Sequence, residues 1–285
     1  MNSYYYHTYG IDIKSHIRFP ELIEITPTDP DISFIISDIR STNNRKEGAI
    51  QEDKIVKRKE ISFLTKNSKI IVDPSHLPIT EYKRHYLLGV GLADLLAQWD
   101  GYLFNAGCVG IKNKAFVLLG KSDAGKSTIG AALYNNGYRI ISDSIVRVVE
   151  SSGELFIYPG FPCLKLEDNT PIELKEGGDP LSEEIDHYRQ YYKFDEGFRT
   201  DKTSLCGFFI LKFGPELSIS KCERDNAITE YRLEPNILDN STIDRPDNIE
   251  SYPVYCVSRK KDVPISSVAK DIDDIIKSEM IINYD

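Results

Sequence analysis

The sequence has few cysteines and no long apolar run. Its 285 residues include five cysteines, an odd number with no C-x-x-C spacing: Cys108, Cys163, Cys206, Cys222 and Cys256. This pattern excludes a disulfide framework and a cysteine zinc site, and indicates reduced thiols. No segment is apolar for long enough to cross a membrane, and the N-terminus lacks the basic and then apolar layout of a signal peptide. We therefore expect a soluble cytoplasmic protein with no membrane partner.

Positive charge is also scarce. The chain has 35 Lys+Arg against 44 Asp+Glu, a formal net charge of −9, and no run rich in lysine or arginine. A nucleic-acid partner is therefore not expected. The histidines show no metal-ligand spacing, and we assign none of them a catalytic role: His7, His16, His76, His85 and His187.

One motif stands out among what is present. Residues 120–127 read Gly-Lys-Ser-Asp-Ala-Gly-Lys-Ser and fit G-x-x-x-x-G-K-[ST], between an apolar run at 115–119 and a helix-like segment that ends at Gly137. Its two glycines let successive N–H groups converge on an anion at a helix N-terminus. Lys126 then reaches the outer phosphates, and the Ser127 hydroxyl is placed to bind Mg²⁺. The predicted nucleotide-binding residues are Gly120, Lys121, Ser122, Asp123, Ala124, Gly125, Lys126, Ser127 and Thr128.

A second chemical element is Asp143, which ends the short apolar strand predicted at 138–141. A carboxylate there can meet a metal ion bound at Ser127, or take a proton from an attacking hydroxyl. The alternative interpretation is an aspartate that only caps the strand end. Because Asp143 follows the strand directly after the loop helix, we favour a role in catalysis and metal binding.

The pattern of apolar residues divides the chain into two parts. Residues 1–80 predict a small β-rich N-terminal part, and residues 81–285 predict the nucleotide domain. Apolar residues at helical spacing from Glu81 to Trp99 predict a helix that leads into the second part. In the first part we expect strands at 9–13, 32–36, 61–64 and 70–72, a loop at 43–48, and a run at 52–60 too charged for the core. In the second we expect strands at 103–111, 115–119, 138–141, 155–158, 207–213 and 219–222, and a last helix at 266–282.

Ordered motifs along most of the chain resemble the C-terminal catalytic domain of the HPr kinase/phosphorylase family. Within it, the closer resemblance is to the serine-kinase homologues that modify lasso-peptide precursors. The loop alone is shared by many NTPases, whereas the ordered set is much more specific. Besides the loop, the matching segments are Tyr9-Gly10-Ile11 to Pro20-Glu21-Leu22, Asn105-Ala106-Gly107-Cys108-Val109, Gly137-Tyr138-Arg139-Ile140-Ile141-Ser142-Asp143 and Pro159-Gly160-Phe161-Pro162-Cys163-Leu164-Lys165-Leu166.

The resemblance implies an α/β P-loop kinase domain of HPr kinase type that uses ATP and Mg²⁺. It implies Asp143 and Lys126 as catalytic residues, Ser127 and Asp143 as metal ligands, and a serine hydroxyl as acceptor. In the lasso-associated members that acceptor is the C-terminal serine of a precursor peptide, so a serine-containing precursor peptide is the expected partner. A homo-oligomer is left open. The chain departs from the family at Asn105, where the family has histidine, and at Ser144, where it has a second aspartate.

Other functions remain open. An intact loop beside an altered acid pair also fits a nucleotide-binding pseudokinase or a regulatory P-loop protein with little transfer activity. An NTPase switch or motor is disfavoured, because the sequence contains neither N-K-x-D nor L-S-G-G-Q. The segment 188–193 fits either a peptide-docking surface or a packed helix. Three basic residues fit either contact with phosphate or acidic peptide, or simple solvation: Lys165, Arg199 and Lys202.

Overall fold

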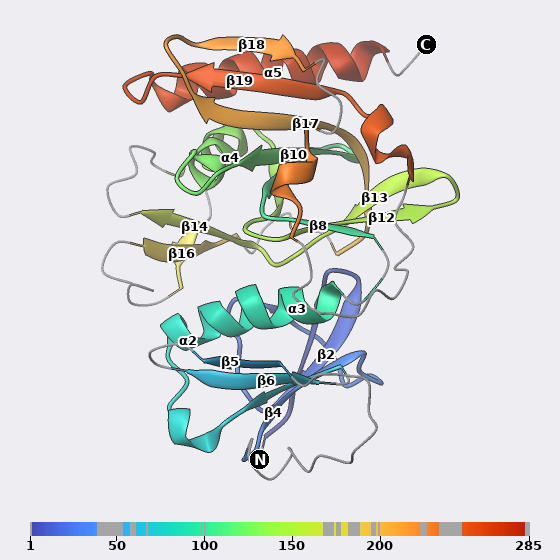
Figure 1. Ribbon diagram of the computed structural model, residues 1–285, viewed down its shortest axis with the longest axis vertical. Coiled ribbons are helices and arrows are strands. Elements are labelled where there is room, and N and C mark those ends of the chain that lie inside the picture. The colour runs from blue at the N-terminus through green and yellow to red at the C-terminus, as the bar shows by residue number, and fades with distance from the viewer. Residues whose placement is uncertain are drawn as a thin grey trace.

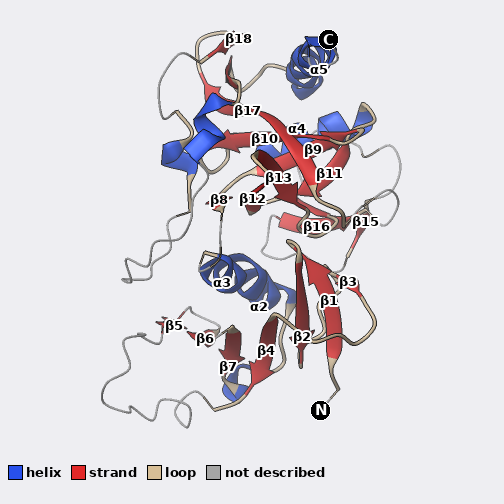
Figure 2. Cartoon of the chain, turned by 90° about the vertical axis from the view of Figure 1, so that its right-hand side faces the viewer, coloured by secondary structure: helices blue, strands red, loops and turns tan. Residues whose placement is uncertain are grey.

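The elements form a lower sheet near the N-terminus and an upper group of strands and helices (Figure 1). A helical segment lies between the two in both views (Figure 2). The predicted α/β class is confirmed, because strands and helices share one chain in both parts. No helix among the described residues has the length and apolar character needed to span a membrane. The structure is a computed structural model that describes residues 2–38, 54–57, 61–66, 68–97, 99, 101–167, 174, 178–181, 189–194, 198, 200–222, 227–233 and 247–282.

The first sheet has seven strands in the order β3-β1-β2-β4-β7-β6-β5. Strand β4 is parallel to both β2 and β7, and the other pairs are antiparallel. The strands predicted at 32–36, 61–64 and 70–72 are confirmed to within one or two residues at their ends. The charged run at 52–60 contains the edge strand β5, and the loop predicted at 43–48 lies outside the described residues. The bounds are β1 (Tyr4–Thr8), β2 (Ile11–Ser15), β3 (Ile23–Glu24), β4 (Ile32–Ile36), β5 (Lys54–Lys57), β6 (Ser62–Lys66), β7 (Lys69–Val72) and the short helix η1 (Pro74–His76).

The strand predicted at 9–13 is wrong at its start. Strands β1 and β2 form an antiparallel hairpin in which Thr8 pairs with Ile11. Its turn has Tyr9 at φ +52° and Gly10 at φ +74°, and two positive φ values give a turn whose twist matches that of the flanking strands. Apolar residues at alternate positions, Tyr9 and Ile11, gave the pattern of a continuous strand. Gly10 between them favours a turn.

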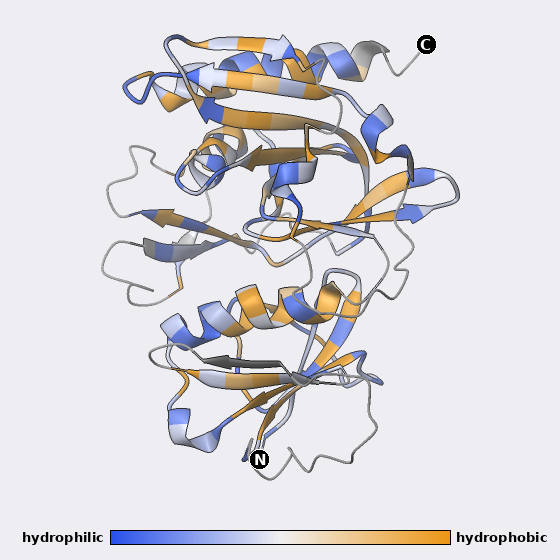
Figure 3. Ribbon diagram, in the orientation of Figure 1, coloured by the Kyte–Doolittle hydropathy of each residue, from blue (hydrophilic) through white to orange (hydrophobic). Residues whose placement is uncertain are grey.

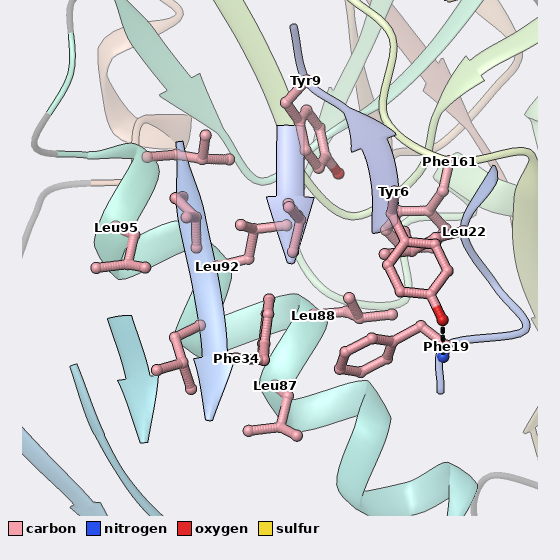
Figure 4. Packing of buried hydrophobic residues seen from close by; sticks show 14 of the residues in the cluster. Tyr6, Tyr9, Phe19, Leu22, Phe34, Leu87, Leu88, Leu92, Leu95 and Phe161 are labelled. Atoms are coloured by element: carbon pink, nitrogen blue, oxygen red, sulfur yellow. Dashed lines mark hydrogen bonds between the residues drawn. The ribbon is translucent and has the colours of Figure 1, made fainter. Parts of the chain in front are cut away.

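The helix predicted at 81–99 is present over 81–96, with a π-helical middle. It consists of α2 (Glu81–Tyr86), η2 (Leu87–Gly91) and α3 (Leu92–Leu96). Its leucines pack onto the first sheet, against residues that include Phe19 and Phe34 (Figure 4). Figure 3 shows the polar start of this segment and its apolar later turns. The helix, which the sequence assigns to the second part, therefore packs into the core of the N-terminal sheet and belongs structurally with the first part.

The second sheet has nine strands, with the central order β11-β9-β10-β17-β13-β12-β8; β19 pairs with β17 and β18. The strand predicted at 103–111 is two strands, because β8 pairs with β12 whereas β9 pairs with β10 and β11. The last helix and the left-handed stop at Gly137 (φ +92°) are confirmed. The bounds are β8 (Tyr102–Phe104), β9 (Gly107–Ile111), β10 (Lys114–Gly120), α4 (Lys126–Asn135), β11 (Arg139–Ser142), β12 (Val146–Ser151), β13 (Glu154–Tyr158), β17 (Thr203–Phe213), β18 (Ser218–Lys221), η3 (Thr229–Tyr231), η4 (Asp247–Ser251), β19 (Val254–Arg259) and α5 (Ile265–Ile282).

A third, small sheet has the order β14-β16-β15. Its strands are β14 (Cys163–Glu167), β15 (Asp179–Pro180) and β16 (Arg189–Lys193). The packed-helix interpretation of 188–193 is therefore wrong for the residues from 189 onward. They form a strand in which Tyr191 pairs with Lys165, in keeping with the preference of tyrosine for a half-buried pleated surface.

Strand direction brings the two chemical elements of the sequence to one edge of the second sheet. Strand β9 is antiparallel to both β10 and β11, so β10 and β11 point the same way. The loop at 120–127 follows β10, and Asp143 follows β11. Ligands of open α/β sheets bind outside the carboxyl ends of such strands, so this edge is where a site is expected.

The tip of the first hairpin joins the N-terminal sheet to the second part. The Tyr9 N–H donates to the Pro159 carbonyl at 2.6 Å, and the Thr8 hydroxyl donates to the Gly160 carbonyl at 2.8 Å. The Arg147 guanidinium donates to the Tyr9 carbonyl at 2.8 Å. These bonds fix the helical segment of the first part close to the carboxyl edge of the second sheet.

Candidate active site

The loop after β10 leads into the first turn of helix α4. Gly125 precedes α4 with φ +94°, a conformation that favours glycine. A side-chain carbon at Gly125 would lie 2.8 Å from the Arg259 Nη2 atom, so the loop also leaves no room for a larger residue. The N–H groups of the first turn, from Lys126 on, have no acceptor within the helix and lie at the positive end of its dipole. This end of α4 is suited to an anion.

Lys126 reaches back over the loop from the first turn of α4. Its Nζ donates to the Gly120 carbonyl at 2.9 Å and to the Lys121 carbonyl at 3.1 Å. Burial lowers the pKa of the Lys126 ammonium, and the nearby carboxylates of Asp143 and Asp123 oppose that effect. A phosphate placed at the loop would give this cation a stronger partner than two neutral carbonyls.

Ser127 and Asp143 are in direct contact. The Ser127 hydroxyl lies 3.0 Å from each carboxylate oxygen of Asp143, and the Lys165 backbone N–H donates to one of them at 3.0 Å. Asp143 is 5% exposed. Ser127 and Asp143, which the sequence proposes as metal ligands, are therefore in contact although 16 positions of the chain separate them.

The carboxyl of Asp143 sits in a balance of opposing effects. Burial raises its pKa above the ordinary value, because a charged group is poorly solvated there. The hydrogen bond from the Lys165 N–H, the charge of the Lys165 ammonium, the Ser127 hydroxyl and the charge of Lys126 all act to lower it. A buried carboxylate with a raised pKa, surrounded by donors and cations, has the properties of a proton acceptor.

A cavity of about 540 Å³ joins these groups. Six of the predicted nucleotide-binding residues line it, while Gly120 and Lys121 offer carbonyls to Lys126 and Ala124 is buried behind the loop. The two positions that depart from the family pattern, Asn105 and Ser144, line the same cavity. The six loop residues on the wall are Ser122, Asp123, Gly125, Lys126, Ser127 and Thr128.

Several residues on the wall were not singled out by the sequence. His85, Gly89 and Ala93 come from the helix of the first part, at four-residue spacing on one face. Arg259 lies at the end of β19, where its Nη2 donates to the Ala124 carbonyl at 3.4 Å. No local pattern marks these residues, because the wall forms only when the two parts of the chain pack together.

The three basic residues whose roles the sequence left undecided lie in different places. Lys165 lies on β14 in the cavity wall and is half-buried. Lys202 is not on that wall, and its Nζ donates to the Ser151 hydroxyl at 2.9 Å. Arg199 lies outside the described residues. Among the described residues, no group of three or more His, Cys, Asp or Glu is placed to hold a metal ion.

Comparisons with solved structures show a distant similarity in fold. No family model matches the chain, and no curated protein matches it. Among solved structures, the HPr(Ser) kinase/phosphatase from Coxiella burnetii aligns with a TM-score of 0.39 and 10% sequence identity, over 64% of this chain and 99% of that chain.

Proposed function

We propose that this protein is an ATP-dependent kinase that phosphorylates a serine on a peptide, most simply the C-terminal serine of a lasso-peptide precursor. The observation that carries the proposal is the contact between Ser127, in the first turn of α4, and Asp143. The hydroxyl lies 3.0 Å from the carboxylate. The peptide and the lasso-peptide role rest on the resemblance in sequence.

The residues present fit a nucleoside triphosphate. The first turn of α4 offers N–H groups, Lys126 offers a charge, and Gly125 provides the left-handed backbone that leads into this turn. In phosphoryl-transfer sites Mg²⁺ is held by one or two carboxylates together with substrate phosphates. The Ser127 hydroxyl and the Asp143 carboxylate would supply the protein's share of that coordination.

The proposed reaction requires little covalent chemistry from the protein. Phosphoryl transfer depends on positioning and on neutralising the charge of the transferring group. In the proposed reaction the serine oxygen attacks the γ-phosphorus of ATP while Asp143 accepts the hydroxyl proton. The bond from the γ-phosphorus to the bridging oxygen breaks and ADP leaves, with Lys126 holding the phosphates. Mg²⁺ would neutralise charge on the phosphate oxygens when bound.

A nucleotide-binding pseudokinase is the second candidate. It is favoured by Ser144 and Asn105, which place neutral side chains on the cavity wall where the resembling family carries an aspartate and a histidine. With only Asp143 to serve as both base and metal ligand, nucleotide binding without efficient transfer is the alternative outcome.

Mass spectrometry separates the two candidates. Purified protein with Mg-ATP should add about 80 Da per transfer to a serine-terminated precursor peptide, and not to the same peptide with alanine at that serine. Transfer that requires the serine supports the kinase. Mg-ATP binding without transfer to any serine peptide supports the pseudokinase.

A further inference from the structure

Lys165 stands at the junction of three parts of the molecule. Its backbone N–H donates to Asp143, so its strand is tied to the proposed base. Its ammonium lies 3.5 Å from His85 Nε2 on the helix of the first part. The other ring nitrogen of His85 lies 2.8 Å from the Tyr191 hydroxyl on the neighbouring strand β16. A chain of contacts thus runs from the N-terminal helix to the side chain beside Asp143.

Strand pairing places this chain where it is. Tyr191 pairs directly with Lys165 in the antiparallel register of β14 and β16, so the two side chains stand on the same face. Tyr191 is 3% exposed, and its ring packs against Phe161 and His85 with centroids 6.3 Å and 6.0 Å apart. Packing therefore holds Tyr191 in place, and its hydroxyl orients the His85 ring.

The protonation states follow from the donors available. An ammonium can only donate, so His85 Nε2 accepts from Lys165 and the ring proton sits on Nδ1. That Nδ1–H then donates to the Tyr191 oxygen. Burial raises the pKa of the Tyr191 hydroxyl well above its ordinary value, so the tyrosine stays protonated and neutral.

Lys165 lines the same cavity wall as Lys126 and Asp143, and its backbone N–H donates to Asp143. The side chain of Lys165 therefore lies beside the proposed transfer site. Lys126 is held by two loop carbonyls at 2.9 and 3.1 Å, whereas the contact of Lys165 with His85, at 3.5 Å, is long. A terminal phosphate would give the Lys165 ammonium a charged partner, which binds an ammonium more strongly than a neutral ring nitrogen does.

We propose that Lys165 is the second cation of the site, binding the terminal phosphoryl group opposite Lys126, and that His85 and Tyr191 are positioning residues that aim it. This inference rests on the proposed function, and it gives the N-terminal part a role in the reaction. The π-helical turn that begins two residues after His85, at Leu87, supports it, since such turns are frequent at functional sites. Gly89 in that turn lines the cavity and has open space in front of it.

Nucleotide binding tests the proposal without any turnover. Calorimetry is run with Mg-ADP and with the magnesium complex of adenylyl imidodiphosphate, an ATP analogue that resists transfer. The Lys165→Met variant should bind the triphosphate analogue at least about tenfold more weakly and Mg-ADP within about twofold of wild type, since one charge-assisted bond to the terminal group is lost. Lys165→Arg should restore part of the loss. His85→Ala and Tyr191→Phe should each weaken the analogue by about two- to fivefold.

A double-variant cycle separates positioning from a purely structural effect. If His85 acts through Lys165, His85→Ala combined with Lys165→Met should bind the analogue no more weakly than Lys165→Met alone. Lys202→Met and His76→Ala are matched controls away from the cavity wall, and both should bind as wild type does. Circular dichroism checks that each variant is folded, and Lys165→Gln replaces Lys165→Met if the latter is not.

Each of four results would overturn all or part of the inference. Equal loss of Mg-ADP and analogue in Lys165→Met would make Lys165 a general support of the cavity. Additive losses for His85 and Lys165 would separate the histidine from the lysine. Wild-type affinity in Lys165→Met, with binding that still depends on Lys126, would refute the second cation while sparing the proposed function. A wild-type protein that binds neither nucleotide would overturn both.

Discussion

Replacing Gly125 by alanine should destabilise the protein by an amount that the structure allows us to estimate. Gly125 has φ +94°, and a residue with a side chain costs about 1–2 kcal/mol in the left-handed region. The added carbon would lie 2.8 Å from Arg259 Nη2, which is closer than such atoms approach. The guanidinium must therefore move.

Moving Arg259 has a further cost. The residue is 6% exposed, donates to the Ala124 carbonyl at 3.4 Å, and lies 4.7 Å from the centre of the Phe213 ring. Losing a hydrogen bond and a cation–π contact costs about 0.5–1 kcal/mol each. Alanine also restricts the unfolded chain, which returns about 0.4–1 kcal/mol. Together these effects lower the free energy of unfolding by about 1–3.5 kcal/mol.

Gly137 provides the matched control. It has φ +92° but nothing within 4 Å of an added carbon, so Gly137→Ala carries the backbone effect alone, about 1 kcal/mol. Urea denaturation of the wild type and both variants measures the difference. Mg-ATP affinity should fall in Gly125→Ala and stay unchanged in Gly137→Ala. Equal destabilisation by the two substitutions would refute the close packing of Arg259 on the loop.

Two further predictions concern carboxylates. Asp143→Asn should lower turnover of Mg-ATP by about 10²–10⁴-fold with little change in its Kd, since the loop and Lys126 supply most of the ground-state binding; Ser144→Asp should tighten Mg²⁺ binding and preserve or raise turnover. Near wild-type turnover in Asp143→Asn would place the chemistry elsewhere. Buried Glu21 has one oxygen 2.7 Å from Arg84 Nε, and its other oxygen has no hydrogen-bond partner among the described residues. Burial raises the pKa of Glu21 above 4.5. The folded state then holds a proton that the unfolded state releases, so the unfolding free energy falls as pH rises above 4.5 through the raised pKa. Denaturation at several pH values should show a smaller fall in Glu21→Gln, and an identical slope would contradict the shift.

Local chemistry is what the sequence predicted well. Gly120 and Gly125 at their spacing, with an apolar strand before and a helix after, define the loop without knowledge of the rest of the fold. Asp143 was found for a similar reason, since a short strand ending in a carboxylate is visible in the sequence. The sequence therefore indicated the loop, the helix α4 and the Ser127–Asp143 pair.

Contacts between distant segments escaped sequence reasoning. His85 lies on a helix that also serves the core of the first sheet, and its apolar neighbours explain that helix completely. Tyr191 is in a strand that looked like a mixed helical face, because paired tyrosines fit both periods. Only the register of β14 with β16 and the packing of the two parts bring these side chains to Lys165.

Calorimetry with Mg-ATP is the most direct test of the claim that residues 120–127 bind a nucleoside triphosphate. We predict saturable binding to the wild-type protein, loss of most of that affinity in Lys126→Ala, and wild-type affinity in Lys202→Ala, whose lysine donates to Ser151 instead. Equal affinity for Mg-ATP in the wild type and in Lys126→Ala would contradict the account, because the loop would then not be the site that holds the phosphates.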